Sequence, residues 1–599
     1  MGSTPPVDAA SPAQSSRSRR RLADAGAIVG VWAFVAFLST AQRWTWLNTP
    51  DAEFYATLGL FGSEVTDRTV TPAYYWTRLG TIAPVRGLTE LLGPWSGYLA
   101  FWLILLAVIV STVFLTVRRF STRFIATLMA LLVALSTVIL TFVGSPYVTG
   151  TAMAAMFVVL AGTVWTLPAP GSPEGARPRR RSRLAAPLLT GLGFGWLVMT
   201  NPNATFMTAA MWLAATAVIT VHVPGRRVRY LLEMIALVTV GAATSFLLLL
   251  GASQVIFPGL DWFETSLFWS RALDLSGYVG DQWAFLRDIS IVVPLTVMLT
   301  VIVALAIRPR DPLLHVAAVL SPTAFGLTLL IVLARPNGTL EVGHYQALQW
   351  PPALWALTLT VAAVAARRPA TGWAVAAGAA GVIATIAAGH WTGTMTLSAG
   401  WAVALVSAAL FLGAVASLTR ASTSPASAAR ALVVLVCCTG LLMAGFQLLQ
   451  NARRPTGVMA EGVYSNAFNP NDTEARLVSS YEAERWLIDQ TSRDDTVMVW
   501  VDADWAQQEQ TLLSMAAFQI WGINQVTPER TMEGAGVGNT RAARASVIAM
   551  YGKSMEAIVT FWSSIPREIG HSDPLCSDYP WPDPAVPTAY VCLTRLTWP

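Results

Sequence analysis

Long apolar runs alternate with short polar connections along most of this 599-residue chain. About 20 consecutive apolar residues are enough to cross the hydrocarbon core of a bilayer as a helix. The first run, at 25–41, is predicted to be a retained span, because no clear small-residue cleavage signal follows it as it would in a signal peptide. Further spans are predicted at 94–117, 124–143, 149–167, 185–200, 204–222, 230–257, 288–307, 313–334, 350–366, 373–390, 400–417 and 431–447. This pattern predicts a polytopic α-helical membrane protein with about 13 transmembrane helices.

The connections between these spans are alternately basic and aromatic. Arginine-rich stretches occur in the N-terminal tail and in every second connection, at 118–123, 177–183, 225–229, 308–310, 367–368 and 419–430. The positive-inside rule places such connections in the cytoplasm. An odd number of spans then puts the C-terminus outside, which predicts a multi-pass protein of the plasma membrane with a cytoplasmic N-terminus.

The composition divides the chain into three parts. Residues 1–24 are polar and rich in proline and serine, which predicts a disordered cytoplasmic tail. The spans occupy residues 25–449. From 450 to 599 the composition becomes that of a water-soluble protein, and an amphipathic helix precedes the β-rich run 496–501. We expect an extracytoplasmic α/β domain there.

The chain contains four cysteines, two of them in the expected outer domain. An oxidising compartment favours a disulfide between Cys576 and Cys592, and two unpaired thiols are the alternative. Cys437 and Cys438 are adjacent within the last predicted span, where cysteine behaves as a small hydrophobe.

The composition also narrows the function. The mean hydropathy is +0.52, and the net charge is +5. The basic residues lie in the connections between spans, where they indicate the topology of the chain. No nucleic-acid partner is therefore expected. The sequence shows no phosphate-binding P-loop, no HExxH zinc motif and no convincing GxSxG elbow. It requires no cofactor, and it leaves open whether a divalent cation takes part.

Two acids, Asp51 and Glu53, lie just after the first predicted span, in the first long outer connection. On a helix, side chains two residues apart point to nearly opposite sides, whereas in an extended segment they share a face. A purely structural role is open to them, because Asn48 or Thr49 can cap a helix that starts at Pro50, and acids in the first turn complement the helix dipole.

The rest of the outer connections favours a functional role. The first one continues with aromatic residues, Arg78 and Arg86, which is typical of interfacial helices that can cradle a lipid head group. The second contains Arg271, whose guanidinium suits a lipid phosphate, although its aromatic residues also fit an ordinary interfacial belt. The third offers Arg335 and His344 at the mouth of a span, where a lone histidine is more often a structural residue than a catalyst.

The order of these features resembles the GT-C superfamily of membrane glycosyltransferases, near its protein-mannosyltransferase and aminoarabinose-transferase branch. "PDAEFYATLGLFG", which begins at Pro50, stands where that family carries its acidic first-loop motif. "TPAYYW" resembles the Pro-aromatic segment that follows, and "GHYQALQWPPALWAL" resembles the family's His/Arg-Tyr segment. The chain departs from the family in the Asp51-Ala-Glu53 spacing, which replaces adjacent acids, and in Asn201, which replaces a turn lysine.

The resemblance implies an inverting transfer of a sugar from a polyprenyl-phosphate-linked donor to a cell-envelope acceptor, a glycan, lipid or protein, at the outer face of the membrane. It implies that Asp51 is the base and that Glu53 assists it. The candidates to bind the phosphate are Arg271, Arg335 and His344. The residues expected to bind the sugar or the acceptor are Tyr55, Tyr74, Tyr75, Trp76 and Tyr345.

A membrane transporter or lipid flippase for envelope precursors is the main alternative. Such proteins generally have ionisable groups or broken helices near the midplane and often have repeated halves. The predicted spans are nearly free of charge, with Glu233 and His315 near their ends, and no repeat is visible. A non-catalytic scaffold with an outer binding domain is a third interpretation, and it predicts no special acid in the first connection.

Overall fold

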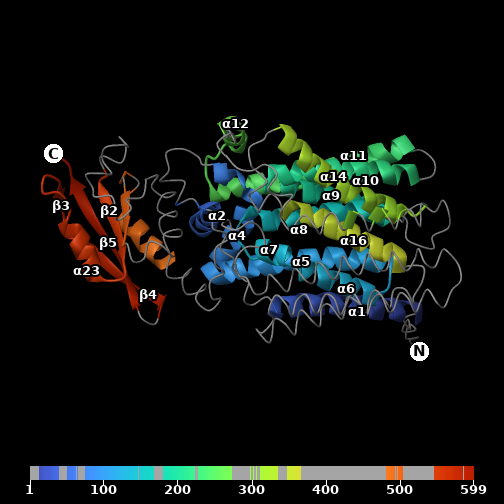
Figure 1. Cartoon of the computed structure of the whole chain (residues 1–599), viewed down its shortest axis with the longest axis horizontal. Coiled ribbons are helices and arrows are strands. Elements are labelled where there is room, and N and C mark those ends of the chain that lie inside the picture. The colour runs from blue at the N-terminus through green and yellow to red at the C-terminus, as the bar shows by residue number, and fades with distance from the viewer. Residues whose placement is uncertain are drawn as a thin grey trace, which may run out of the picture.

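A computed structural model of the chain separates a helical bundle from a small sheet domain (Figure 1). The residues that the structure describes are 12–38, 50–62, 64, 74–145, 147–167, 180–222, 227–272, 297–298, 301–302, 305, 310–334, 347–365, 481–492, 494–495, 497–502, 545–583 and 586–599. The helices of the bundle run roughly along one direction, and the sheet lies beyond one end of them (Figure 1).

The bundle contains long helices and several short ones. They are α1 (Pro12–Leu38), α2 (Pro50–Phe61), η2 (Tyr74–Thr77), α4 (Leu79–Leu92), α5 (Pro94–Phe120), α6 (Arg123–Ala134), α7 (Thr137–Val143), α8 (Val148–Trp165), α9 (Arg180–Val198), α10 (Pro202–His222), α11 (Arg227–Ile256), α12 (Trp262–Ala272), α14 (Pro312–Ala334), η7 (Ala347–Gln349) and α16 (Trp350–Ala365). We call the end of the bundle nearest the sheet the domain end. The opposite end, where α5 ends and α6 and α11 begin, we call the basic end (Figure 1).

Several apolar helices make this a mostly helical membrane protein. Within the described residues, five helices are long and apolar enough to cross a membrane: α5, α8, α10, α11 and most of α14. They begin and end within a few residues of the corresponding predicted spans, and α9 and α16 lie where spans were predicted as well. The predicted spans at 373–390, 400–417 and 431–447, and most of the one at 288–307, lie outside the described residues, so the count of about 13 stays a prediction.

The predicted span at 124–143 is two helices in the structure. α6 ends at Ala134 and α7 begins at Thr137. Leu135 closes α6 by donating its backbone N–H to Leu131, and Ser136 then leaves the helical path before α7 starts. An apolar run can contain such a break because hydropathy depends only on the side chains and carries no information on the backbone conformation.

The polar tail is shorter than the composition suggests, since α1 begins at Pro12 and not at residue 25. Asp24 of α1 pairs with Arg118 of α5 at 3.2 Å and with Arg123 of α6 at 2.6 Å. These ion pairs attach α1 to α5 and α6. The composition of the N-terminal segment does not reveal this attachment.

Glycine lets α9 and α11 approach closely. A Cβ atom at Gly191 of α9 would lie 2.1 Å from the carbonyl oxygen of Val238, and one at Gly241 of α11 would lie 2.3 Å from that of Leu188. Contacts this short leave no room for a side chain at either position. The glycine-rich run around Gly191 therefore packs helices, as its place inside a predicted span indicates.

The sheet domain has five described strands, β1 (Val497–Val501), β2 (Val547–Gly552), β3 (Gly570–His571), β4 (Leu575–Asp583) and β5 (Val586–Thr597). β1 and β2 are parallel, and β5 pairs antiparallel with β2, β3 and β4. Residues 481–490 and α23 (Met555–Ser563) add helices. The amphipathic helix and the β-rich run near 496–501 are both present, so this part is a small mixed α/β unit.

A disulfide joins the two longest strands of this sheet. Cys576 of β4 lies directly opposite Cys592 of β5 in the antiparallel register, and the two cysteines are bonded. The bond closes a loop of 16 residues.

Candidate active site at the domain end

The helix that carries the two acids is α2, which begins at Pro50 and lies between the bundle and the sheet (Figure 1). Position 51 is therefore in its first turn. Because the segment is helical, positions 51 and 53 are about 200° apart around the helix axis, and only one of them shares a face with Tyr55. That one is position 51, which lies four residues before Tyr55. The side chains of Asp51 and Glu53 lie outside the described residues.

The far end of α2 is attached to α4 and α5 by hydrogen bonds to its backbone. Tyr98 of α5 donates its hydroxyl to the carbonyl of Ala56 at 3.0 Å. Thr89 of α4 donates its hydroxyl to the carbonyl of Gly59 at 3.0 Å. The last carbonyls of a helix have no partner within it, so side chains that bond them stabilise the helix end and fix its position.

Close packing supports these bonds. A Cβ atom at Gly59 would lie 2.5 Å from Cγ1 of Val85, which shows how near α2 comes to α4. Arg86, also on α4, donates from its guanidinium to the carbonyl of Leu60 and forms an ion pair with Glu90 at 2.7 Å. α2 is thus held at its C-terminal end, and its acidic first turn is the opposite end.

Three tyrosines from separate segments meet beside α2. The ring of Tyr55 contacts Tyr75 of η2 edge to face, with centroids 5.4 Å apart, and Tyr147, which precedes α8, at 5.6 Å. Tyr55 and Tyr147 are buried, and Tyr75 is half-buried. Two of these three residues are among the predicted site residues. Tyr147, which lies in the short connection between α7 and α8, is not.

The short helix η2 is held from two sides. Trp76 is buried and stacks on Phe257, with centroids 5.9 Å apart. Trp262 of α12 donates its indole N–H to the carbonyl of Thr77 at 2.8 Å. A residue from the first outer connection and one from the second are therefore in contact, as a shared site in the outer connections requires.

The start of α4 rests on the turn between α9 and α10. Gly80 donates its backbone N–H to the carbonyl of Met199 and accepts from the indole N–H of Trp196, both at 2.8 Å. A Cβ atom at Gly80 would lie 2.0 Å from the hydroxyl oxygen of Thr200. In the same turn, Asn201 accepts from a backbone N–H of α10 and so caps that helix. This gives Asn201 a structural role as a helix cap.

The sheet domain contacts the bundle just after α2. Tyr481 stacks on Phe61, the last residue of α2, with centroids 5.3 Å apart and planes within 13° of parallel. Arg485 donates to both carboxylate oxygens of Glu64, at 2.7 and 2.6 Å. This hydrogen bond to Glu64 raises the pKa of Arg485. We did not single out these residues from the sequence, although Arg485 lies on the polar face of the amphipathic helix.

Burial raises the pKa of one carboxyl group of the sheet domain. Glu484, beside Arg485 on the same helix, is fully buried and accepts the hydroxyl of Tyr551 at 2.9 Å. Burial raises its pKa to about 8, and the hydrogen bond offsets only part of that shift. Glu484 is therefore protonated in the folded domain at neutral pH.

The remaining predicted site residues have less structural information. The backbone positions of Tyr74 and Arg271 are described, in η2 and near the end of α12, but their side chains are not. Arg335, His344 and Tyr345 lie outside the described residues. Among the described residues, no group of three or more histidine, cysteine, aspartate or glutamate side chains could hold a metal ion.

The chain is similar in structure, over nearly its full length, to solved structures of ArnT and AglB. One is ArnT from Cupriavidus metallidurans in the apo state, with a TM-score of 0.44 and 12% sequence identity over 96% of this chain and 98% of ArnT. The same protein bound to undecaprenyl phosphate gives 0.41 and 14%, over 94% and 97%. The other is the archaeal oligosaccharyltransferase AglB from Archaeoglobus fulgidus, in complex with an inhibitory peptide and a dolichol-phosphate, at 0.42 and 12% over 94% of this chain and 74% of AglB. No family model and no curated protein sequence matches the chain.

Proposed function

We propose that this protein is a glycosyltransferase that moves a sugar from a polyprenyl-phosphate-linked donor to a cell-envelope acceptor at the domain end of the bundle. The observation that carries the proposal is the placement of α2. Its first turn carries Asp51 one helical turn from Tyr55 and the tyrosine cluster, while its last residue, Phe61, contacts the sheet domain.

The proposed reaction requires the protein mainly to align the acceptor hydroxyl with the donor sugar. The hydroxyl oxygen of the acceptor attacks the anomeric carbon, the bond from that carbon to the phosphate oxygen breaks, and the polyprenyl phosphate leaves with the electron pair. Asp51 accepts the proton of the hydroxyl, and attack opposite the leaving group inverts the anomeric centre. The leaving phosphate already carries charge, so a cation beside it and good alignment are the other requirements.

We assign sugar or acceptor binding to the aromatic residues of the first outer connection. Tyr55 contacts the half-buried Tyr75, and Trp76, beside Tyr75 in η2, stacks on Phe257. Aromatic rings stack on the apolar faces of sugars and offer a hydroxyl at the edge. We assign phosphate binding to Arg271, since α12 contacts η2 through Trp262, and to Arg335 and His344.

The test is transfer of a labelled sugar by membranes that contain the protein. We expect Asp51→Asn to reduce transfer by a hundredfold or more, on the order of what a general base contributes, because the amide keeps the size of the side chain but cannot accept the proton. Glu53→Gln is the matched control, and it should cost much less since position 53 is on another face of α2. Thermal melting and donor binding should stay near those of the unmodified protein.

Three results would contradict this assignment. If Asp51→Asn is active and Glu53→Gln is not, Glu53 is the base. If both variants are fully active, the acids only complement the dipole of α2, and Asp261 and Glu264 are next to be tested. If the unmodified protein consumes no polyprenyl-phosphate sugar but moves such lipids across vesicle membranes, it is a flippase.

A further inference from the structure

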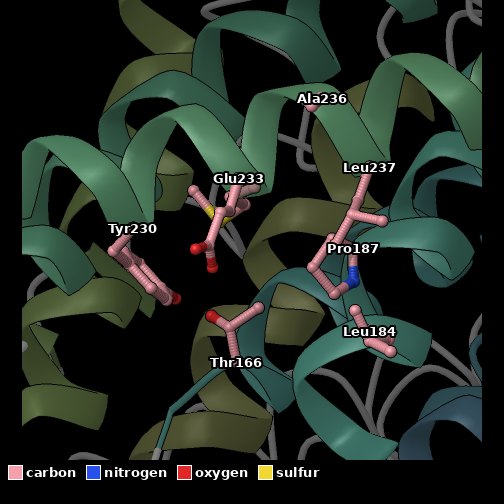
Figure 2. Close-up of a pocket in the computed structure, with 8 residues that line it drawn as sticks. Thr166, Leu184, Pro187, Tyr230, Glu233, Ala236 and Leu237 are labelled. Carbon is pink, nitrogen blue, oxygen red and sulfur yellow. The ribbon is translucent and has the colours of Figure 1, made fainter. Parts of the chain in front are cut away.

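A pocket lies between α8, α9 and α11 at the basic end of the bundle, away from the candidate active site (Figure 2). Its volume is about 290 Å³. One wall is apolar and consists of Leu184 and Pro187 from α9 with Met234, Ala236 and Leu237 from α11. Such a wall suits a hydrocarbon chain.

The other side of the pocket is polar. The hydroxyl groups of Thr166 and Tyr230 and the carboxylate of Glu233 point toward a common space (Figure 2). Thr166 donates its hydroxyl hydrogen to the carbonyl of Thr163 at 2.7 Å, so its oxygen acts as an acceptor on the pocket side. Two hydroxyl groups and one negatively charged carboxylate thus surround one corner.

A cationic side chain stands beside this corner. Arg229 donates its Nε hydrogen to Glu233 at 3.0 Å, and its side chain is 69% exposed. Arg227, also exposed, is two residues closer to the start of α11. A guanidinium and a carboxylate therefore lie next to each other at the mouth of an otherwise apolar pocket.

The depth of these residues matches the boundary between head groups and acyl chains. α11 has 30 residues, which corresponds to about 45 Å, close to the full thickness of a bilayer with its head groups. Glu233 is six residues from the start of α11, roughly 9 Å along its axis. α11 is also the least buried of the five long apolar helices, with only 17% of its most apolar window inside the bundle. A helix this exposed on the surface of the bundle is expected to border lipid along much of its length.

We propose that this pocket binds one phospholipid with a primary-amine head group, taken from the leaflet at the basic end. The ammonium group carries three N–H donors, which match the three oxygens of Thr166, Tyr230 and Glu233. A carboxylate has about four acceptor sites, so Glu233 can accept from Arg229 and from the ammonium together. Arg229 binds the phosphate, and an acyl chain lies along the apolar wall between α9 and α11.

The amine is what distinguishes this lipid from the others of the bilayer. A trimethylated head group carries the same charge but has no N–H donor for these oxygen atoms. An anionic lipid without an amine gains from Arg229 but faces the negative charge of Glu233. The proposal is independent of the glycosyltransferase reaction, because the pocket lies at the other end of the bundle.

Native mass spectrometry of the purified full-length protein tests the proposal. The protein is incubated with equal amounts of phosphatidylethanolamine, phosphatidylcholine and phosphatidylglycerol of identical acyl chains. We expect retention of the ethanolamine lipid over the choline lipid by about tenfold, as the loss of hydrogen bonds to a charged group implies. Glu233→Gln should reduce this preference to about twofold or less.

A matched pair of variants separates the pocket from the general lipid coat. Ala236→Trp fills the pocket and should abolish preferential retention, whereas Val240→Trp places the same ring one turn along the same face of α11, outside the pocket lining, and should leave it unchanged. Equal retention of all three lipids, or equal lipid binding by both tryptophan variants, would overturn the proposal. Preferential binding of phosphatidylglycerol that depends on Arg229 would overturn it in favour of an anionic-lipid site.

Discussion

The two ends of the bundle are held together by different interactions. At the domain end, neutral side chains donate to backbone carbonyls of α2, α4 and η2. Thr89 and Tyr98 are buried, and Trp196 and Trp262 are half-buried. At the basic end, ion pairs between partly exposed side chains tie the starts and ends of long helices, as Asp24 does.

This difference has a physical consequence for function. Buried hydrogen bonds between neutral groups are insensitive to salt. Breaking one leaves a buried donor or acceptor without a partner, which costs free energy, so these bonds hold the helices in one arrangement. Exposed ion pairs contribute about 1 kcal/mol or less and are screened by salt. A reaction that depends on alignment is better placed at the domain end, whereas the basic end suits anchoring among charged lipid head groups.

The largest effect should come from removing the disulfide of the sheet domain. Replacing Cys576 and Cys592 together by alanine frees a loop of 16 residues, and we expect the domain to lose about 3 kcal/mol of stability. The melting transition of the sheet domain should fall, and that of the bundle should stay. Reducing agent added to the unmodified protein should have the same effect. Unchanged melting in both cases would show that the bond contributes nothing.

Gly80→Ala should break the neutral contacts of the domain end. The added methyl group would lie 2.0 Å from Thr200, and overpacking of this kind typically costs about 1 to 3 kcal/mol. We expect a fall of several degrees in the melting temperature, together with reduced sugar transfer.

The control for this variant lies on the same helix. Gly87 of α4 has no atom within 4 Å of an added Cβ, so Gly87→Ala should be neutral or stabilise slightly through helix propensity. If both variants melt alike, the close approach of α4 to the turn before α10 is not a constraint on the domain end.

The buried carboxyl group of Glu484 predicts a pH dependence that is confined to the sheet domain. Its pKa in the folded domain, about 8, is raised above the ordinary value of 4.5. Between these two values the unfolded chain releases a proton that the folded domain keeps, so the contribution of Glu484 to stability is fully present below pH 4.5 and is lost as the pH rises toward 8.

Glu484→Gln should abolish this fall because the amide does not titrate. Melting temperatures measured from pH 5 to 8 provide the test, with the exposed Glu482→Gln on the same helix as the control. A sheet domain whose melting in the unmodified protein does not change over this range would contradict the raised pKa.

The smallest effect should come from the contact between the two parts of the molecule. Arg485 and Glu64 are 43% and 30% exposed, so their ion pair should be worth less than about 1 kcal/mol despite its good geometry. Arg485→Ala and Glu64→Ala should each shift melting by about a degree, and the double variant should add little. High salt should remove the difference. If the coupling energy between Arg485 and Glu64 persists in high salt, this ion pair is as insensitive to salt as the neutral hydrogen bonds of the domain end.

The long helices were predictable because a bilayer imposes their length. α5, α8, α10, α11 and α14 begin and end close to the predicted spans, since each needs enough apolar residues to cross the hydrocarbon core. The break between α6 and α7 and the early start of α1 were not predictable. The break is a change of backbone direction at Ser136, and α1 forms ion pairs with α5 and α6 through Asp24; hydropathy contains neither.

Some residues of the candidate site were likewise predictable from the sequence, and others were not. The sequence placed Asp51, Glu53, Tyr55, Tyr75 and Trp76 in one outer connection, because acids and aromatic residues are unusual so close to apolar runs. It could not place Tyr147 beside Tyr55, since the two are brought together only by the packing of α8 against the helices around it.

By itself, the sequence determined that the chain spans a membrane several times, that a water-soluble α/β unit follows, and which connection carries the unusual acids. Composition and period are local properties, and they suffice for these conclusions. Only the tertiary structure decided that the acids lie on a helix, so that one of them and not both shares the face of Tyr55. It also decided that Thr166, Tyr230 and Glu233 form one corner of a pocket, because those residues come from helices that meet only when the bundle folds.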